Sequence, residues 1–358
     1  MSESLLDFVE SVNGTSHLRV EQDFGDGFVR LNLSEAERRQ AAQDIRSSED
    51  IVLEMLRNSR DAHASHIFVA IGREGAKRNI TVIDDGCGIP PAMHDLVFES
   101  RVTSKLDTSH MDEWGIHGRG MALFSISLNA QQAYVVDSAP DLGCCMHVVS
   151  DTGALPEKSD QSTFPTFSMG EDGVVRVRGP RNILRTVCEF AIRSRAACSV
   201  YTGSAAEIAA TLYAYGVSTL SAIDRLFCQD AGELPIVKRL ATTGDPSSFA
   251  EMAQGMGLQL SERTARRILD GEIDAIDSVL KRVEIRPDGQ EKRRGNAKRT
   301  RAARPIKLTA DETEMVSDAV KEAFSEIARK YYLEEGVEPT IRTYRDKLAI
   351  TVPIVSQS

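Results

Sequence analysis

The 358-residue sequence has no apolar run that approaches the length of about 20 residues needed to span a membrane. Its first residues, MSESLLDFVESVNG, lack the basic start and following apolar stretch of a secretory signal. From both absences we expect a cytoplasmic protein that has no membrane partner.

Two common binding motifs are also missing. None of the six cysteines lies in a C-x-x-C pair, so buried thiols in a reducing compartment are favoured over paired metal ligands. The pattern G-x-x-x-x-G-K-[ST] does not occur, which excludes a P-loop. A nucleotide would have to be held in another way.

The chain has too little positive charge to attract nucleic acid over its whole surface, because its net charge is -10. One segment is different: residues 281–307 hold eleven Lys or Arg and three Asp or Glu, so they carry +8 and the rest carries -18. This basic segment contains no aromatic residue for base stacking, so we expect contact with the DNA backbone that does not depend on base sequence. The alternative is a solvated linker between acidic parts of the chain.

A first candidate site motif is EMLRNSRDA, residues 54–62. On a helix, Glu54, Asn58 and Asp61 fall within about 60° of one another and therefore share one stripe. An amide oxygen can complete the shell of a magnesium ion without adding charge beside phosphates. A carboxylate nearby that does not bind the metal can accept a proton from water.

Two further motifs follow along the chain. In DDGCGIP, residues 84–90, the glycines permit close approach of a planar ligand, and the preceding carboxylate can accept a hydrogen bond from an exocyclic amino group such as that of adenine. In GIHGRGM, residues 115–121, backbone N–H groups just before a helix can surround phosphate oxygens. Each motif alone is common on protein surfaces, but the three together indicate a nucleotide site.

These residues resemble the GHKL ATPases, the superfamily of DNA gyrase B subunits, the ninety-kilodalton heat-shock chaperone, sensor histidine kinases and MutL mismatch-repair proteins. MutL is the most similar in pattern: Glu54, Asn58, Asp61 and Ala62 match its N-box, and Asp84 with GCGI, the triplet TSK at 103–105 and GRGMALFSI follow in the same order. The resemblance implies an α+β protein whose nucleotide domain is a two-layer α/β sandwich, the Bergerat fold.

The resemblance also implies roles for single residues. Glu54 corresponds to the general base that activates water, Asn58 to the Mg2+ ligand and Asp84 to the adenine-binding carboxylate. A Glu at the first position, where sensor kinases usually have Asn, favours ATP hydrolysis over phosphate transfer to histidine. The other residues expected to contact the nucleotide are Gly86, Gly88, Ile89, Thr103, Lys105, Gly115, Gly118, Arg119, Gly120 and Met121.

The resemblance is strong over residues 48–130 and departs in two places. Gly118 and Met121 replace the Phe and Glu of the MutL lid motif. Beyond residue 216 the sequence predicts helices, where MutL and gyrase continue into an α/β domain that supplies a lysine to the γ-phosphate, and no lysine is identified for that role. The expected organisation is a tail (1–17), a GHKL ATP-binding domain (18–215), a helical module (216–280), the basic linker (281–307) and a C-terminal helix with strands (308–358).

The expected function is a Mg2+-dependent, slowly hydrolysing ATPase that acts as an ATP-driven switch or clamp in a DNA-related process, with an ATP-dependent homodimer as a hypothesis. Two alternatives stay open. The segment FAEMAQGMGLQLSERTARRILDG, residues 249–271, resembles a helix-turn-helix with three arginines on its second helix, which fits an ATP-sensing DNA-binding regulator without significant turnover. The other alternative is a chaperone-like ATPase that acts on proteins.

Overall fold

The structure is a computed structural model in which the chain forms two compact units, residues 1–289 and residues 290–358, each described here by itself. Within the described part of the chain, no helix has both the length and the apolar character of a membrane span. The described residues are 20–25, 27–31, 35–103, 111–112, 115–116, 121–158, 160–170, 174–228, 230–283, 285–287, 309–331, 333–343 and 348–354.

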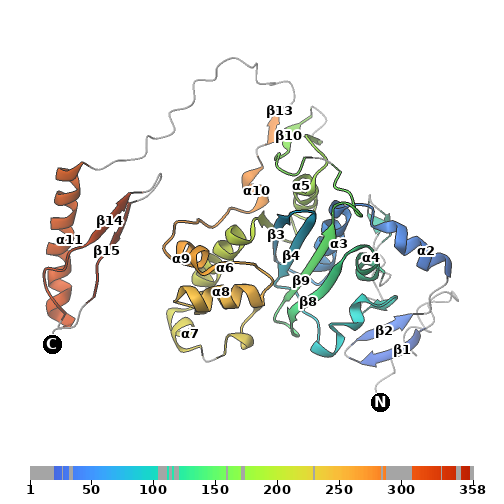
Figure 1. The fold of residues 1–358 in the computed structure, drawn as a ribbon, viewed down its shortest axis with the longest axis horizontal. Coiled ribbons are helices and arrows are strands. Elements are labelled where there is room, and N and C mark those ends of the chain that lie inside the picture. Colours follow the sequence, from blue (N-terminus) through green and yellow to red (C-terminus); the bar gives the residue numbers. More distant parts are fainter. Residues whose placement is uncertain are drawn as a thin grey trace. The chain divides into compact units, whose positions relative to one another are not determined.

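A five-stranded mixed sheet forms the centre of the first unit (Figure 1). In spatial order its strands are β12 (Ser199–Gly203), β3 (His66–Glu74), β4 (Lys77–Asp84), β9 (Cys144–Asp151) and β8 (Gln132–Ser138). β12 runs parallel to β3, whereas the other three pairs are antiparallel. The strands are rich in Val and Ile, whose branched side chains suit a pleated, buried surface.

Alternate residues of these strands enter two separate hydrophobic cores, because successive side chains of a strand point to opposite faces. On β3, Ile67 and Val69 belong to the core on one face, which we name the first face. Phe68 and Ala70 belong to the core on the other, the second face. Both faces of the sheet are therefore covered.

The first face is covered by α3 (Ser48–Asp61), α4 (Ala122–Asn129) and α5 (Ile183–Arg193), and α2 (Glu35–Asp44) packs on α4. Side-chain caps fix two of the helix starts: the side chain of Ser47 accepts from the backbone N–H of Asp50, and that of Asn182 accepts from Arg185. Such a cap satisfies one of the N–H groups that the first turn leaves without a helical partner.

The second face is covered by α6 (Ala205–Thr219), η4 (Ile236–Thr242), α8 (Pro246–Gly255) and α9 (Glu262–Leu269). Gly216 permits the close packing of α6 on η4, since a Cβ there would lie 2.6 Å from the Cβ of Ala241. The boundary expected between residues 215 and 216 thus falls inside α6. The shorter elements α7 (Ala222–Phe227) and η3 (Ala231–Glu233) connect α6 to η4.

Smaller elements surround this body. Three smaller sheets and three short helices complete the first unit: β1 (Val20–Gly25) with β2 (Phe28–Leu31) and β5 (Val102–Thr103); β11 (Val175–Arg178) with β10 (Thr166–Met169) and β13 (Ile285–Pro287); β6 (Met111–Asp112) with β7 (Gly115–Ile116); η1 (Pro91–Met93), η2 (Leu96–Phe98) and α10 (Val279–Arg282).

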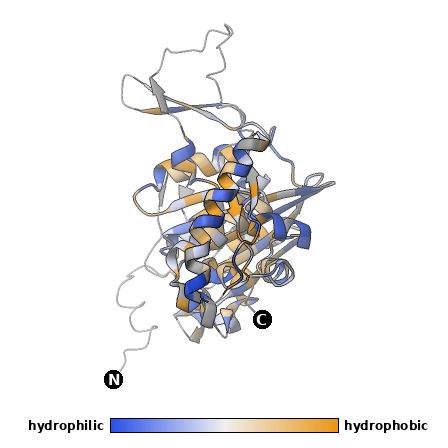
Figure 2. Cartoon of the chain, turned by 90° about the vertical axis from the view of Figure 1, so that its left-hand side faces the viewer, coloured by the Kyte–Doolittle hydropathy of each residue, from blue (hydrophilic) through white to orange (hydrophobic). Residues whose placement is uncertain are grey.

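The second unit contains α11 (Ala310–Tyr331) and the antiparallel hairpin of β14 (Thr340–Thr343) and β15 (Leu348–Thr351). Figure 2 shows hydrophobic and hydrophilic residues alternating along α11, as expected of an amphipathic helix. Thr309 caps the helix: its hydroxyl accepts from the backbone N–H of Glu312, whose carboxylate in turn accepts from the backbone N–H of Thr309.

The predicted α+β class, with a sheet packed on helices and further helices after it, is confirmed. The two expected layers correspond to the sheet and its first face, and the helices after residue 204 add a layer on the second face. β10 and β12 were not expected from the sequence. The expected basic linker begins with regular structure, because residues 281–282 end α10 and residues 285–287 form β13.

Candidate functional site

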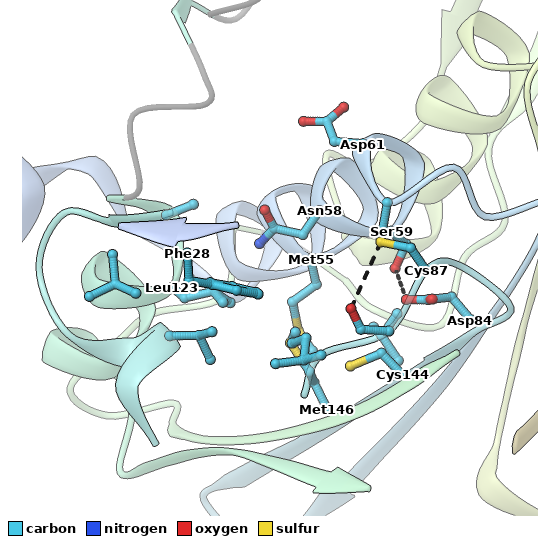
Figure 3. A pocket seen from close by; sticks show the side chains of 17 residues that line it. Phe28, Met55, Asn58, Ser59, Asp61, Asp84, Cys87, Leu123, Cys144 and Met146 are labelled. Atoms are coloured by element: carbon cyan, nitrogen blue, oxygen red, sulfur yellow. Dashed lines mark hydrogen bonds between the residues drawn. The ribbon is translucent and has the colours of Figure 1, made fainter. Parts of the chain in front are cut away.

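An open cavity of about 970 Å³ lies between α3, the loop after β4, α4 and the small sheet of β1, β2 and β5 (Figure 3). Polar side chains enter it from α3 and from the end of β4, and apolar side chains form most of the remaining wall. The polar lining residues are Asn58, Ser59, Asp61 and Asp84, and the larger apolar ones are Phe28, Met55, Val82, Val97, Leu123 and Met146. An apolar cavity with a few converging polar groups is typical of a small-molecule site.

Asp84 is the best-defined polar group of the cavity. It is the last residue of β4 and is 5% exposed. The Ser59 hydroxyl donates to its Oδ2 at 2.6 Å, and the backbone N–H of Gly86 donates to its Oδ1 at 2.9 Å. A carboxylate oxygen has two lone pairs, so this fixed carboxylate can still accept from a ligand.

The glycines of DDGCGIP were expected to make room for a planar ligand, but in the structure they make room for the protein's own backbone. A Cβ on Gly88, whose φ is +70°, would lie 2.0 Å from the carbonyl oxygen of Ala139. A Cβ on Gly86 would lie 2.7 Å from the carbonyl oxygen of Ala62. The space that these glycines leave is therefore filled by the protein's own backbone, which packs this loop against the end of α3 and the turn between β8 and β9.

The loop is held on the β8 side by a serine. The backbone N–H of Ile89 donates to Ser138 Oγ at 2.7 Å, and this hydroxyl donates to the carbonyl oxygen of Gly143 at 2.8 Å. Gly143 itself approaches the backbone of Asp84, because a Cβ there would lie 2.1 Å from the Asp84 carbonyl oxygen. The cavity wall is thus fixed from both ends of DDGCGIP.

The second aspartate of the motif, Asp85, supports the loop from outside the cavity lining. Its Oδ1 accepts from the backbone N–H groups of Ser65 and His66, at 2.7 Å each, and its Oδ2 lies 2.9 Å from His66 Nδ1. Burial acts to raise the pKa of Asp85, but the hydrogen bonds from His66 and Ser65 outweigh it and leave the pKa below its ordinary value. Asp85 therefore stays ionised and fixes the turn between α3 and β3.

The three residues of α3 that were expected to share one polar stripe, Glu54, Asn58 and Asp61, differ in their surroundings. Asn58 and Asp61 line the cavity, and Asp61 pairs with Arg60 at 2.9 Å. Glu54 lies one turn before Asn58 and is not part of the cavity lining in the described residues; its carboxylate forms an ion pair with the guanidinium of the buried Arg57. The helix brings Asn58 to the cavity and leaves Glu54 beside an arginine.

The remaining expected site residues divide into three groups. Gly88 and Ile89 line the cavity together with Asn58 and Asp84, whereas Gly86 and Met121 are near it in sequence but are not part of its described lining. Thr103 and Gly115 are placed only by their backbones, in β5 and β7. Lys105, Gly118, Arg119 and Gly120 lie outside the described residues.

Sequence reasoning missed Ser59 and the apolar wall. Ser59 follows Asn58 directly, and together with Met55 and Ala62 it repeats at helical spacing along the cavity side of α3. That spacing was visible in the sequence. The contribution of Cys144 and Met146 was not, because it depends on the pairing of β9 with β4, which brings Cys144 opposite Asp84.

Cys144 behaves as an apolar part of the wall. Burial raises the pKa of its thiol, and the negative charge of Asp84 raises it further. A thiol in this state is protonated and does not ligate metal. It packs beside the carboxylate without competing for a ligand.

The donor set fits a magnesium ion that is held mainly by a ligand's phosphates. No group of three or more His, Cys, Asp or Glu side chains capable of holding a metal occurs in the described part of the chain. Mg2+ in nucleotide sites commonly takes one or two protein oxygens, with phosphates and water as its other ligands. Asn58 offers one such oxygen at the cavity wall.

Comparison with known proteins gives consistent matches to this part of the chain. A family model described as histidine kinase-, DNA gyrase B-, and HSP90-like ATPase matches residues 43–153. The DNA mismatch repair protein MutL of Aquifex pyrophilus is 37% identical over 105 residues, which are 28% of this chain and 24% of that protein.

Two further relatives carry the same description. MutL of Coxiella burnetii is 40% identical over 102 residues, which are 27% of this chain and 17% of that protein. MutL of Parabacteroides distasonis is 34% identical over 112 residues, which are 30% of this chain and 18% of that protein. The matched part of the chain thus spans about a quarter or less of the length of these relatives.

Proposed function

We propose that residues 43–153, which match the family model of histidine kinase-, DNA gyrase B-, and HSP90-like ATPases and are similar to part of MutL, form a GHKL ATPase domain that binds ATP with Mg2+ in the cavity and hydrolyses it slowly. The observation that carries the proposal is the fixed Asp84 carboxylate facing the same cavity as Asn58. The Asp84 carboxylate is suited to bind the adenine base, and the Asn58 amide is suited to bind a metal ion beside the phosphates.

In this proposal Asp84 accepts a hydrogen bond from the adenine amino group. Ser59 and Gly86 each donate to one carboxylate oxygen, so the acceptor is oriented before the ligand arrives. Such preorganisation reduces the entropy lost on binding. The side chains of Met55, Val82 and Met146 offer apolar contact to a planar base.

Glu54 is proposed to accept the proton of the water that attacks the γ-phosphate. Its ion pair with Arg57 holds the carboxylate on the helix turn next to Asn58. Asn58 would help to hold a magnesium ion beside the phosphates, and that ion would supply positive charge to stabilise the charge that develops during phosphoryl transfer. Thr103, Lys105 and the glycines 115, 118 and 120, with Arg119 and Met121, stay predicted contacts of the phosphates.

We further propose that ATP drives a switch that acts on DNA, with homodimerisation in the ATP state. The relatives are named as DNA mismatch repair proteins, and the basic segment 281–307 supplies +8 of charge for phosphate contact. The helix-turn-helix alternative is less well supported, because Arg266 pairs with Glu262 and Arg267 pairs with Glu272 on or beside α9.

The deciding experiment measures ATP turnover with and without Mg2+, duplex DNA and single-stranded DNA, on the full chain and on a chain lacking residues 288–307. We expect turnover that requires Mg2+ and a DNA response that is lost with the deletion. ATP binding without turnover would favour the regulator, and turnover with no DNA affinity at low salt would favour an ATPase that acts on proteins. Light scattering with a non-hydrolysable ATP analogue tests the dimer, because an unchanged mass contradicts it.

A further inference from the structure

The small sheet of β11, β10 and β13 includes residues 285–287 of the basic segment as its strand β13 (Figure 1). β10 is its central strand, with β11 antiparallel on one side and β13 parallel on the other. β13 consists of residues 285–287, so the chain passes from this sheet directly into residues 288–307. The two regions are thus continuous along the chain.

The register of the sheet places basic residues side by side. Ser168 of β10 is paired with Arg176 of β11 and with Arg286 of β13, so these three positions form one row across the sheet. Arg178 is paired with Thr166 in the next row of the same face. Three arginine positions from two distant parts of the sequence therefore share one face of a three-stranded sheet.

That face is the solvent side of the sheet. The opposite face carries Phe167, which is 3% exposed, with Val175 and Val177 of β11, and all three pack against the first-face core. Since side chains alternate along a strand, Arg176 and Arg178 lie on the other side, and both are exposed. The sheet thus presents its polar face outward.

We propose that the outer face of this sheet, with Arg176 and Arg178 next to the position of Arg286, is a contact surface for the phosphate backbone of duplex DNA and adds to the contact made by the basic segment. This inference rests on the DNA role proposed above, and it places part of the DNA contact on the folded first unit. Arg181, also exposed, follows β11 and adds a fourth charge beside the face.

The geometry of the face suits a duplex backbone. Arg176 and Arg178 are two residues apart on one strand, about 7 Å, and Arg176 and Arg286 are two strands apart, about 10 Å. Each DNA strand presents one phosphate per about 3.4 Å of helix axis, so long arginine side chains at these separations can each contact a different phosphate.

The composition of the face favours phosphates over bases. Its five positions in the paired rows are Thr166, Ser168, Arg176, Arg178 and Arg286, and none is aromatic. Proteins that hold single strands rely on aromatic side chains for base stacking, which this face does not offer. In the sequence, Glu171 and Asp172 stand between β10 and β11 and reduce the net positive charge of this part of the chain.

The test compares two pairs of arginine substitutions in the full chain, Arg176→Gln with Arg178→Gln on the sheet and Arg263→Gln with Arg266→Gln on α9. Binding of a labelled duplex of arbitrary sequence is measured between 50 and 200 mM salt. Each lost phosphate contact reduces the slope of log affinity against log salt concentration by about 0.9. Between 50 and 200 mM salt, the factor by which affinity falls should therefore be about 12 times smaller for the sheet variant than for the parent chain. The α9 variant should behave as the parent.

ATP turnover without DNA and the circular dichroism spectrum should be unchanged in both variants, because neither pair touches the cavity. An unchanged salt slope in the sheet variant, or an equal change in both variants, overturns the inference while leaving the proposed DNA role intact. Preference for a single strand over a duplex also overturns it. If the parent chain shows no duplex binding at 50 mM salt, the proposed DNA function itself has failed.

Discussion

The two faces of the central sheet are built by alternate residues of the same strands, yet one face borders the cavity and the other is buried beneath helices. On the first face, Val82 and Met146 border the cavity that contains Asn58 and Asp84. On the second face, Ile83 and Cys145 are completely buried beneath helices. A strand that supplies a ligand wall on one side is thus held in place by close packing on the other.

The comparison shows why the second face matters for the site. Asp84 is the last residue of β4, and its neighbour Ile83 is 0% exposed within the second-face core. Asp85 fixes His66, whose ring lies 4.8 Å from that of Tyr215 on α6. The helices after residue 204 therefore support the strand ends that carry the cavity's polar groups.

The largest expected effect belongs to the first face. Glu54→Gln removes the proposed proton acceptor while keeping the shape of the side chain, so ATP turnover should fall about a hundred- to ten-thousand-fold with little loss of nucleotide binding. Turnover and analogue affinity are measured on the same preparation. Glu189→Gln, which alters an ion-paired glutamate on α5, is the matched control and should turn over normally. Normal turnover in the Glu54 variant would contradict the assignment of Glu54 as the proton acceptor.

The next effect tests whether the second face is part of the same folding unit. Phe249 of α8 is completely buried in the second-face core, so Phe249→Ala should destabilise the protein by about 3–5 kcal/mol. Because this core includes β3, β4 and β9, unfolding followed by urea should remain one transition for both faces, and ATP-analogue binding should be lost at the same denaturant concentration. Two separate unfolding transitions would indicate that the helices of residues 216–280 fold as an independent module.

A smaller effect concerns adenine recognition. Asp84→Asn replaces a charged acceptor by a neutral one of the same shape, so affinity for an ATP analogue should fall about ten- to a hundredfold. Asp85→Asn is the control, since Asp85 contacts Ser65 and His66 and not the cavity; its affinity should change by less than about threefold. Equal losses in both variants would indicate that the loop as a whole, and not one carboxylate, determines affinity.

The same contrast explains what the sequence could predict. Glu54, Asn58 and Asp84 stand in short motifs whose spacing is visible locally, so the helix α3 and the strand end that carry them were expected correctly. Turn residues and runs of Val and Ile also mark the hairpin of β1 and β2 and the strands β3, β4, β8 and β9 locally in the sequence.

What the sequence did not predict depends on pairing over long distances. β12 has only five residues between two helices, and it is a strand because Val200 and Tyr201 pair with Ile67 and Phe68 far earlier in the chain. The helices after residue 204 have helical signals of their own, but nothing local indicates that they cover the same sheet. The helical spacing of Ser59 was visible, but its hydrogen bond to Asp84 was not, because the two residues are 25 positions apart in the sequence.

The smallest effect is a pH dependence that belongs to the second face alone. His147 of β9 is 6% exposed, its Nδ1 lies 2.8 Å from Thr81 Oγ1, and that hydroxyl donates to the carbonyl oxygen of Gly257. A hydroxyl has one proton, so Nδ1 is the donor to Thr81. Burial lowers the pKa of His147 below its ordinary value, so the folded protein keeps the ring neutral where the unfolded chain already binds a proton.

The sign of the pH effect follows from this difference. The stability due to the neutral ring is fully present above about pH 6.5 and is lost as the pH falls through the lower pKa of the folded state, with a slope of at most about 1.4 kcal/mol per pH unit. Urea unfolding at pH 7.5, 6.5 and 5.5 measures it, and His147→Gln should flatten the dependence. If the variant keeps the full dependence, another group is responsible. Because His147 faces the helices and not the cavity, analogue affinity of the folded protein should follow a different pH profile from its stability, which would separate the two faces in one titration.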